Sequence, residues 1–296
     1  MQIRVVLNSP RPLADQLVNQ VHELVPHAVV ALRSDRGFSS VAITGPAPDR
    51  HFDDVDGRAL RRRVRQLTAD AAVDSAVIWG PLAEQPPALL VSDVDSTLID
   101  AEVIELLAER AGSRAEVAEV TERAMRGELD FTESLTSRVK TLAGLDVGIF
   151  AEVAEQVRLS PGAAELVEAV QQAGGAVGLV SGGFIEVVAP LAESLEIDLV
   201  RANSLEVSDG RLTGRTTPGV PVVDRAAKAD QLRQWAARLG VDLGRTVAIG
   251  DGANDLDMLA TSGFGIAYCA KPVTAEAAEA AISFPSLLAG ASFLGL

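Results

Sequence analysis

The sequence predicts an α/β protein in two parts: a small two-layer α+β domain, followed by a parallel sheet core that carries a helical cap. Two patterns support this fold class. From Ala88 onward, short apolar runs alternate with longer helical stretches, which is typical of parallel strands joined by crossover helices. The helical stretch between the first two of these runs is much longer than one crossover needs, so we expect an inserted cap at about 100–172.

The composition indicates a folded enzyme of the cytoplasm. The chain has 296 residues, enough for two domains, and hydrophobic residues make up 48%, which excludes disordered and fibrous proteins. Lys plus Arg number 26 against 41 for Asp plus Glu, so the acidic surface disfavours nucleic acid and membrane surfaces as partners. Cys269 is the single cysteine, and residues 1–10 lack the apolar core of a signal peptide.

The first domain, residues 1–84, has the pattern strand, helix, strand, strand, helix, strand. The expected strands are Ile3–Leu7, Val29–Leu32, Val41–Ile43 and Ala76–Trp79, and the expected helices are Leu13–Leu24 and Arg58–Leu67. Two proline-containing pairs, Gly80-Pro81 and Pro86-Pro87, then interrupt all periodicity. We therefore place the domain boundary near Leu82–Pro87.

The second domain, residues 85–296, contains five predicted strands: Leu89–Ser92, Val177–Val180, Leu199–Arg201, Thr246–Ile249 and Gly265–Tyr268. Within the cap, Gly112, Gly127 and Gly144 are expected to end helices. Asp209-Gly210 lies between two short strand-like segments and predicts a two-residue hairpin turn, which would form a small flap.

Carboxylates follow two of these strands directly. Asp93 and Asp95 come after the first strand, and Asp251 and Asp255 come after the strand Thr246–Ile249. Either segment alone is compatible with an acidic surface loop. Both together, each at the carboxyl end of a buried strand, predict a site for a hard cation with oxygen ligands.

Two further segments carry groups that suit an anion. Ser181-Gly182-Gly183 follows the second strand and precedes a helical run, where a hydroxyl and free backbone N–H groups form a phosphate cradle. Helix capping alone is the alternative for this turn. Lys228 lies in the first turn of the predicted helix Arg225–Leu239, and taken by itself it is a solvated lysine.

Together these segments resemble the haloacid dehalogenase superfamily, through Asp-x-Asp-x-Thr, a serine at a strand end, a lysine and Gly-Asp-Gly-x-Asn-Asp in that order. The resemblance covers Ala88 to the C-terminus and implies a Rossmann-like sheet with strand order 3-2-1-4-5. It implies that Asp93 is the nucleophile and that Asp95 is the general acid and base. Asp251 would hold Mg²⁺ with Asp93 and the backbone carbonyl of Asp95. The remaining implied residues are Asp255 and Asn254 in the acidic loop, with Ser181, Gly182 and Lys228 around the phosphoryl group.

The cap contains an arginine on an apolar helix face. Phe131, Leu135, Val139 and Leu142 form an apolar stripe, and Arg138 projects from almost the same face. An arginine in such a stripe requires an anionic partner. This partner is either a substrate or one of the many glutamates of the cap.

The cap also resembles the phosphoserine phosphatase family, through the segment Asp93-Val-Asp-Ser-Thr-Leu-Ile-Asp with Glu102, and through Met125-Arg-Gly-Glu-Leu-Asp-Phe131 with Arg138. In that family the glutamate binds the substrate ammonium, the arginine binds its carboxylate, and the Met and Phe shut out water. For Glu102 the alternative is a favourable position near a helix N-terminus. The resemblance implies Mg²⁺-dependent release of serine and phosphate, the last step of L-serine biosynthesis. The alternatives are another small phosphomonoester substrate or an amino-acid-sensing module.

The N-terminal domain loosely resembles ACT-type regulatory domains in its order of strands and helices. Many such domains bind amino acids at a glycine-containing turn after the first strand. Here the turn is Asn8-Ser9-Pro10-Arg11, which contains no glycine. We therefore expect a role in packing or in a homodimer at least as readily as a role in ligand sensing.

Overall fold

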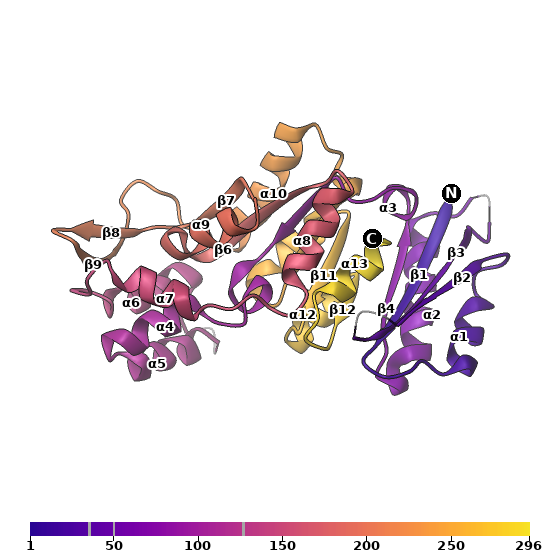
Figure 1. The fold of residues 1–296 in the computed structure, drawn as a ribbon, viewed down its shortest axis with the longest axis horizontal. Coiled ribbons are helices and arrows are strands. Elements are labelled where there is room, and N and C mark those ends of the chain that lie inside the picture. The colour runs from indigo at the N-terminus through magenta and orange to yellow at the C-terminus, as the bar shows by residue number, and fades with distance from the viewer. Residues whose placement is uncertain (35–36, 50, 126–127) are drawn as a thin grey trace.

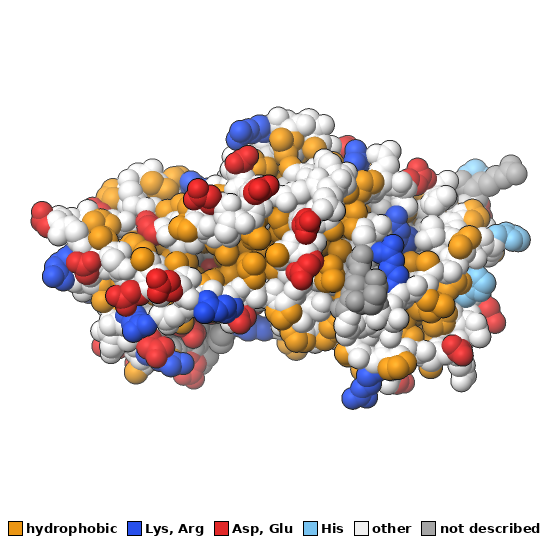
Figure 2. Space-filling model, in the orientation of Figure 1, with side chains coloured by type: hydrophobic (Ala, Val, Ile, Leu, Met, Phe, Trp, Pro, Cys, Tyr) orange, Lys and Arg blue, Asp and Glu red, His pale blue; other side chains and the backbone are white. Residues whose placement is uncertain are grey.

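The computed structural model describes residues 1–296 apart from 35–36, 50 and 126–127 (Figure 1). The N-terminal domain lies at one end, the core sheet in the middle and the cap at the other end. On the face drawn in Figure 2, acidic and basic side chains are mixed over the cap, whereas apolar side chains gather between the cap and the N-terminal domain. No helix among the described residues is long and apolar enough to cross a membrane.

The N-terminal domain is a four-stranded antiparallel sheet covered on one face by two helices. The sheet has the order β2-β3-β1-β4, with β1 at Gln2–Ser9, β2 at Val29–Arg33, β3 at Ser39–Pro46 and β4 at Asp74–Trp79. The helices are α1 (Asp15–His22) and α2 (Asp54–Thr68). Ile3, Val5 and Leu7 of β1 pack with both helices, while Val6 faces the core domain. The predicted order of elements is confirmed, and the ACT assignment itself stays a prediction.

Helix α2 begins four residues before the predicted start at Arg58. Asp53 caps it: its side chain accepts from the backbone N–H groups of Val55 and Asp56, and the Asp56 side chain accepts from the backbone of Asp53. This capping box satisfies N–H groups that the first turn leaves unpaired. The first turn has no inward-facing apolar side chain, so the apolar pattern alone places the start too late.

The predicted linker contains a short helix, α3 (Pro81–Glu84), whose Leu82 and Ala83 are buried. The Arg4 guanidinium donates to the carbonyls of Leu82 and Ala83, at 3.3 and 3.0 Å. It also donates to the carbonyl of Leu294 near the C-terminus, at 2.8 Å. The segment between the two domains is therefore held by contacts to both domains.

The N-terminal sheet packs on helix α13 (Leu288–Leu294), which lies between the two domains (Figure 1). The Asn8 side chain donates to the carbonyl of Ala289 at 3.0 Å. Arg65 of α2 donates to the carbonyls of Ala278 and Glu279, at 2.7 and 3.1 Å. Asn8, where an ACT-type ligand site would begin, thus packs against the core, which favours the packing role.

The core sheet has the order β12-β11-β10-β5-β6-β7, and every adjacent pair is parallel. Its strands are β5 (Leu89–Ser92), β6 (Ala176–Phe184), β7 (Leu199–Asn203), β10 (Thr246–Gly250), β11 (Phe264–Tyr268) and β12 (Ala280–Ile282). The predicted order of the first five strands is confirmed. The edge strand β12 was not predicted, because three residues are too few to give a period. Since β5 and β10 are neighbours, their acidic ends lie side by side.

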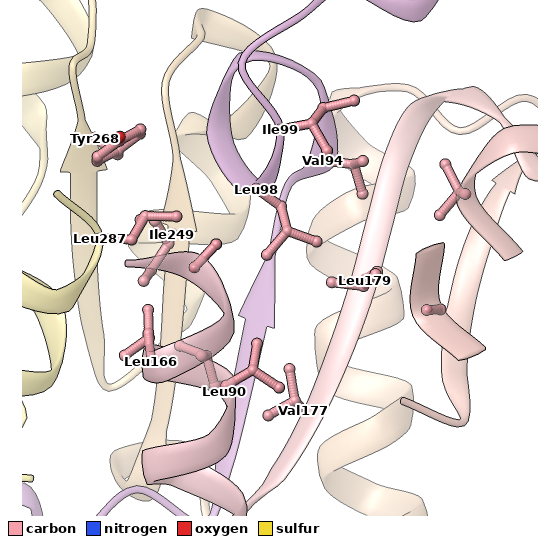
Figure 3. Close-up of a cluster of buried hydrophobic side chains, with 14 of the residues drawn as sticks. Leu90, Val94, Leu98, Ile99, Leu166, Val177, Leu179, Ile249, Tyr268 and Leu287 are labelled. Carbon is pink, nitrogen blue, oxygen red and sulfur yellow. The ribbon is translucent and has the colours of Figure 1, made fainter. Parts of the chain in front are cut away.

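Apolar side chains on one face of the sheet fix these strand ends. Figure 3 shows Leu90, Val177, Leu179 and Ile249 of the sheet beside Leu166 of α8 (Ala163–Gln172). The segment after β5 contributes Val94, Leu98 and Ile99, all of which are buried. Replacing such a buried Leu by Ala costs about 2–5 kcal/mol of stability. The chain that carries Asp93 and Asp95 is therefore anchored on this face of the sheet.

The cap consists of α4 (Val103–Ala111), α5 (Arg114–Met125), α6 (Phe131–Lys140) and α7 (Ile149–Gln156). Two crossing segments join it to the core, where Ile99 and Leu159 form an antiparallel bridge. Gly112 ends α4 with φ of 70°, as predicted, whereas Gly127 lies outside the described residues. Helix α8 falls inside the predicted cap range but packs on β6 and α13.

A hairpin from the core reaches the cap. Strands β8 (Leu205–Ser208) and β9 (Arg211–Thr216) meet at Asp209-Gly210, where both residues have positive φ, 52° and 74°. This is the geometry of the predicted two-residue turn. β9 packs against α6, and the Arg211 guanidinium donates to the Gly144 carbonyl at 2.8 Å. The remaining core helices are α9 (Ile185–Ser194), α10 (Arg225–Leu239), α11 (Leu256–Thr261) and α12 (Pro272–Ala277).

Candidate active site

Three carboxylates and one ammonium meet at the carboxyl ends of β5 and β10. Asp93, Asp251 and Asp255 each offer a carboxylate oxygen, and these oxygens all lie within 4.8 Å of one another. The ammonium of Lys228 lies 2.7 Å from Oδ1 of Asp93 and 2.7 Å from Oδ1 of Asp255. The two acidic segments that the sequence singles out are therefore brought together.

Lys228 is a buried part of this cluster, so its interpretation as a solvated lysine is wrong. Helix α10 begins after Asp224, whose side chain accepts from the N–H of Ala227, and this cap fixes the turn that carries Lys228. The lysine is 0% exposed. Burial alone would lower its pKa, but the ion pairs with Asp255 and Asp93 raise the pKa of Lys228 above its usual range. It is a fixed positive charge.

The cluster has more negative than positive charge. Burial raises the pKa of Asp93 well above its usual range, and repulsion from Asp255 adds to this effect. Burial and Asp255 likewise raise the pKa of Asp251. Three carboxylates around one ammonium lack two positive charges, which a divalent cation supplies. Hard oxygen donors at this spacing therefore fit a divalent metal ion such as Mg²⁺.

Glycines allow the loop after β10 to fold tightly over Asp255. A side chain on Gly250 would place its Cβ 2.4 Å from the Asp255 carboxylate carbon. The N–H of Gly252 donates to Oδ2 of Asp255 at 3.0 Å, while Oδ1 meets Lys228. Both oxygens of Asp255 are thus engaged by the protein, and Asn254 from the same loop lines the cavity.

The predicted phosphate cradle is a bulge at the end of a strand, directly before a helix. Ser181, Gly182 and Gly183 belong to β6, which runs past the predicted end at Val180 and shifts register against β7 between Val180 and Phe184. Helix α9 follows at Ile185, as the predicted helical run indicates. The Ser181 hydroxyl accepts from the N–H of Gly183 at 2.7 Å. A Cβ on Gly183 would lie 2.5 Å from the Asp95 carboxylate, so this position requires glycine.

The side chain of Asp95 points away from the three-carboxylate cluster. Its Oδ2 accepts from the Ser181 hydroxyl at 2.8 Å, and its Oδ1 accepts from the N–H of Val103 at 2.8 Å. Val103 is the first residue of α4, so Asp95 bonds to both the cradle and the cap. Its carboxylate is absent from the group of possible metal ligands, and a contribution from its backbone carbonyl stays a prediction.

Glu102 lies where the cap begins and faces the cavity. It occupies the N-cap position of α4 but makes no capping bond. Its Oε1 accepts instead from the hydroxyl of Ser96 at 2.6 Å, and Ser96 has a φ of 55°. Burial, and next repulsion from Asp95, raise the pKa of Glu102 to about 7.

The cap closes a cavity of about 530 Å³ over these groups. The predicted site residues that line it are Asp93, Asp95, Glu102, Phe131, Arg138, Gly182, Asp251 and Asn254. Ser181, Lys228 and Asp255 are fully buried. The structure does not describe the side chain of Met125.

Arg138 reaches the cavity from α6 beside Phe131, as the stripe predicted. Burial lowers the pKa of Arg138, and the negative charge of Glu102 opposes this effect. Among the described residues no carboxylate pairs with Arg138 within salt-bridge distance, so the alternative of a partner glutamate in the cap is not supported. The Phe131 ring covers the cradle, since a Cβ on Gly182 would lie 3.0 Å from it.

Several cavity or cluster residues were not predicted as site residues, among them Glu105, Lys271 and Thr97. Glu105 and Lys271 line the cavity as exposed charges, and neither has a sequence signal that separates it from other surface charges. The Thr97 hydroxyl donates to Oδ1 of Asp251 at 3.3 Å. The position of Thr97 in the Asp-x-Asp-x-Thr motif was the sequence signal that could have identified it.

The family model described as haloacid dehalogenase-like hydrolase matches residues 90–260. A phosphoserine phosphatase of Streptomyces coelicolor is 47% identical over 290 residues, 95% of this chain and 70% of that protein. One of Mycobacterium tuberculosis is 48% identical over 85% of this chain and 61% of its own length. One of Streptococcus thermophilus is 52% identical over 67% of this chain and 92% of that protein. The chain thus spans 61–92% of the length of these relatives.

Solved structures agree with the sequence relatives. A haloacid dehalogenase family hydrolase from Salmonella enterica serovar Typhi matches 99% of this chain and 98% of its own, with a TM-score of 0.84 and 26% identity. A phosphoserine phosphatase solved with an analogue of its phospho-aspartyl intermediate matches 71% of this chain and 99% of its own. Its TM-score is 0.66 and its identity is 36%.

Proposed function

The chain belongs to the haloacid dehalogenase-like hydrolases and, within them, to the phosphoserine phosphatases, and we propose that it hydrolyses O-phosphoserine to serine and inorganic phosphate. One observation carries the substrate: Glu102 and Arg138 line a single cavity that also contains Asp93. A substrate with a phosphate, an ammonium and a carboxylate matches these groups in charge.

We propose that Asp93 and Asp251, with the backbone carbonyl of Asp95, hold Mg²⁺. The bound ion would offset the negative charge of the phosphate and of the attacking carboxylate. Asp255 has both oxygens engaged with Lys228 and Gly252, so its role in this proposal is to support the loop and Lys228.

Asp93 is proposed as the nucleophile. Lys228 and the N–H of Val94 both meet its Oδ1, and no described donor meets Oδ2. Oδ2 attacks phosphorus, the bond from phosphorus to the serine oxygen breaks, and an aspartyl phosphate forms. Lys228 and the N–H groups of the cradle offset the charge on the transferred group.

Asp95 is proposed to carry the proton in both steps. It gives a proton to the departing serine oxygen and later takes one from the water that attacks the aspartyl phosphate, which releases inorganic phosphate. Its bonds to Ser181 and Val103 fix the carboxyl group between the cradle and the cap. Because Val103 begins the first cap helix, cap position and proton transfer are linked.

The cap groups select the substrate. Glu102 would bind the ammonium of phosphoserine and Arg138 its carboxylate, which fixes the serine at two points. Phe131 covers the cradle and limits the entry of water. The position of the reaction at the end of L-serine biosynthesis, a cytoplasmic location and a homodimer stay predictions from the sequence.

Initial rates on a panel of phosphomonoesters test this function. The panel contains phosphoserine, phosphoethanolamine, a sugar phosphate and phosphohomoserine, each with Mg²⁺ and with excess EDTA. We expect phosphoserine to have the highest kcat/KM and EDTA to abolish turnover. A higher kcat/KM for any other ester, or full activity in EDTA, would contradict the proposal.

A further inference from the structure

Asn203, at the end of β7, fills the break that the cradle bulge makes in the core sheet. Val180 of β6 pairs with Arg201, and the next pair joins Phe184 to Asn203, so β6 carries extra residues between them. Such a bulge leaves backbone groups without a partner in the ladder. Asn203 is 2% exposed, and its side chain supplies bonds that the ladder lacks.

The contacts of Asn203 fix which end of its amide is which. Nδ2 donates to the carbonyl of Gly182 at 2.8 Å, and Oδ1 accepts from the N–H of Val223 at 2.8 Å. A carbonyl only accepts and a backbone N–H only donates, so the reversed amide would break both bonds. Asn203 therefore supplies a donor to the cradle in one fixed direction.

This donor is the first link in a chain of hydrogen bonds that ends on Asp95. The carbonyl of Gly182 and the N–H of Gly183 belong to one planar peptide group, so fixing one fixes the other. The Gly183 N–H donates to the Ser181 hydroxyl at 2.7 Å, and that hydroxyl donates to Oδ2 of Asp95 at 2.8 Å. Successive bonds of this kind strengthen one another.

We propose that Asn203 is a positioning residue that orients Asp95 for proton transfer, acting through the Gly182–Gly183 peptide and the Ser181 hydroxyl. The inference rests on the acid and base role proposed for Asp95. The backbone at Gly183 has little freedom to adjust, because a Cβ on this residue would already lie 2.5 Å from the Asp95 carboxylate. Without Asn203 the Gly182–Gly183 peptide turns and the Ser181 hydroxyl loses the N–H of Gly183 as its donor. Asp95, which accepts from that hydroxyl, then leaves its productive orientation.

The effect should fall on the rate and not on phosphate affinity. Lys228 is held independently by Asp93 and Asp255, and α10 keeps its own cap at Asp224. The main positive charge at the phosphoryl site thus stays in place. A misplaced proton-transfer group typically costs about 10-fold to 100-fold in rate.

Oxygen exchange between ¹⁸O-labelled inorganic phosphate and water, with Mg²⁺ present, measures this step without phosphoserine. In the exchange Oδ2 of Asp93 bonds to phosphorus, a P–OH bond breaks, and the hydroxide leaves as water with a proton from Asp95. The return step adds solvent water, whose proton goes back to Asp95. The rate reports proton transfer, and the half-saturating phosphate concentration reports affinity.

Asn203→Ala should lower the maximal exchange rate about 10-fold to 100-fold and change half-saturating phosphate less than about threefold. Asn8→Ala is the matched control: Asn8 is also a buried asparagine with two side-chain bonds, to Ala289 and Ser292, but it lies in the N-terminal domain. It should change both quantities less than about twofold.

Asn203→Asp keeps the side-chain volume and the acceptor for Val223, and it carries the test if the alanine variant does not fold. Its carboxyl donates to Gly182 only when protonated, so its exchange rate relative to wild type should fall as pH rises. A flat ratio near one would overturn the inference.

For Asn203→Ala, a wild-type exchange rate, an equal loss of phosphate affinity, or the same loss in Asn8→Ala would each overturn the inference. A wild-type protein that exchanges no oxygen would refute the role of Asp95, and the inference with it. Exchange without hydrolysis of phosphoserine would refute only the proposed substrate.

Discussion

Replacing Arg138 by alanine separates a phosphoserine phosphatase from a general phosphomonoesterase. Arg138 lies beside Phe131 on the cavity wall. Among the described residues, no carboxylate lies within salt-bridge distance of its guanidinium. In the proposed complex the substrate carboxylate is its anionic partner. In Arg138→Ala that carboxylate would lie unpaired in a cavity that already holds Glu102 and Glu105.

Truncating one partner of a desolvated charge pair costs about 2–5 kcal/mol, or about 30-fold to several thousandfold in kcat/KM. We expect a loss of this size on phosphoserine. Phosphoethanolamine lacks the carboxylate, so its kcat/KM should change less than about threefold. Arg138→Lys should lie between, because lysine keeps the charge and loses the two-pronged geometry.

Arg114→Ala is the matched control on the same cap. Arg114 on α5 is 69% exposed and pairs with Glu109 at 3.7 Å on the surface, so its loss should leave both substrates within about twofold of wild type. Circular dichroism and Tm establish that each variant is folded. Equal losses on both substrates in folded Arg138→Ala would make Arg138 a structural residue and refute the reasoning.

Three further predictions concern the metal, the nucleophile and pH. Excess EDTA should abolish hydrolysis of phosphoserine and Mg²⁺ should restore it, whereas Ca²⁺, with its looser coordination, should bind without supporting turnover; undiminished rates in EDTA would contradict the metal site. Asp93→Asn should lower kcat at least about a thousandfold in steady-state assays. Its Tm should stay near or above that of wild type, because the variant removes one of several crowded carboxylates. A loss of kcat below about tenfold would exclude Asp93 as nucleophile. The pKa of Glu102 is raised to about 7, so the charged carboxylate that would bind the ammonium is lost as pH falls. The kcat/KM for phosphoserine, relative to that for 3-phosphooxypropanoate, which lacks the amine, should therefore drop about tenfold from pH 8 to pH 6. The two esters share the phosphate titration, so a flat ratio, or the same slope in Glu102→Gln, would refute this role.

Much of the core and of the cluster was predictable from the sequence because strands and motifs are local. The apolar runs that end at Ser92 and Ile249 each lead directly into acids, and the parallel order of strands brings these ends together. The apolar stripe from Phe131 likewise placed Arg138 in the cavity wall, since helical period alone decides which side chains share a face.

Features that depend on tertiary packing were not predictable. The burial of Lys228 follows from its two acidic partners, which are distant in sequence. The bulge in β6 has no periodic signature, so the strand was predicted to end at Val180 when it continues to Phe184. Asn203 carried no signal in the sequence. The contact of Asn8 with α13 joins opposite ends of the chain, which no local pattern reveals.

Trapping the covalent intermediate tests the central claim most directly. Wild-type protein is mixed with ³²P-labelled phosphoserine and Mg²⁺ and quenched in acid within milliseconds, and the ³²P bound to the protein is counted. Borohydride then displaces the phosphate and reduces the acyl carbon to an alcohol, and mass spectrometry locates the reduced residue. We predict that bound ³²P forms at least as fast as phosphate is released, that Asp93 is the one reduced residue, and that both signals are absent in Asp93→Asn. Reduction at any other residue, or release of phosphate in a single turnover with no bound ³²P, would contradict the account.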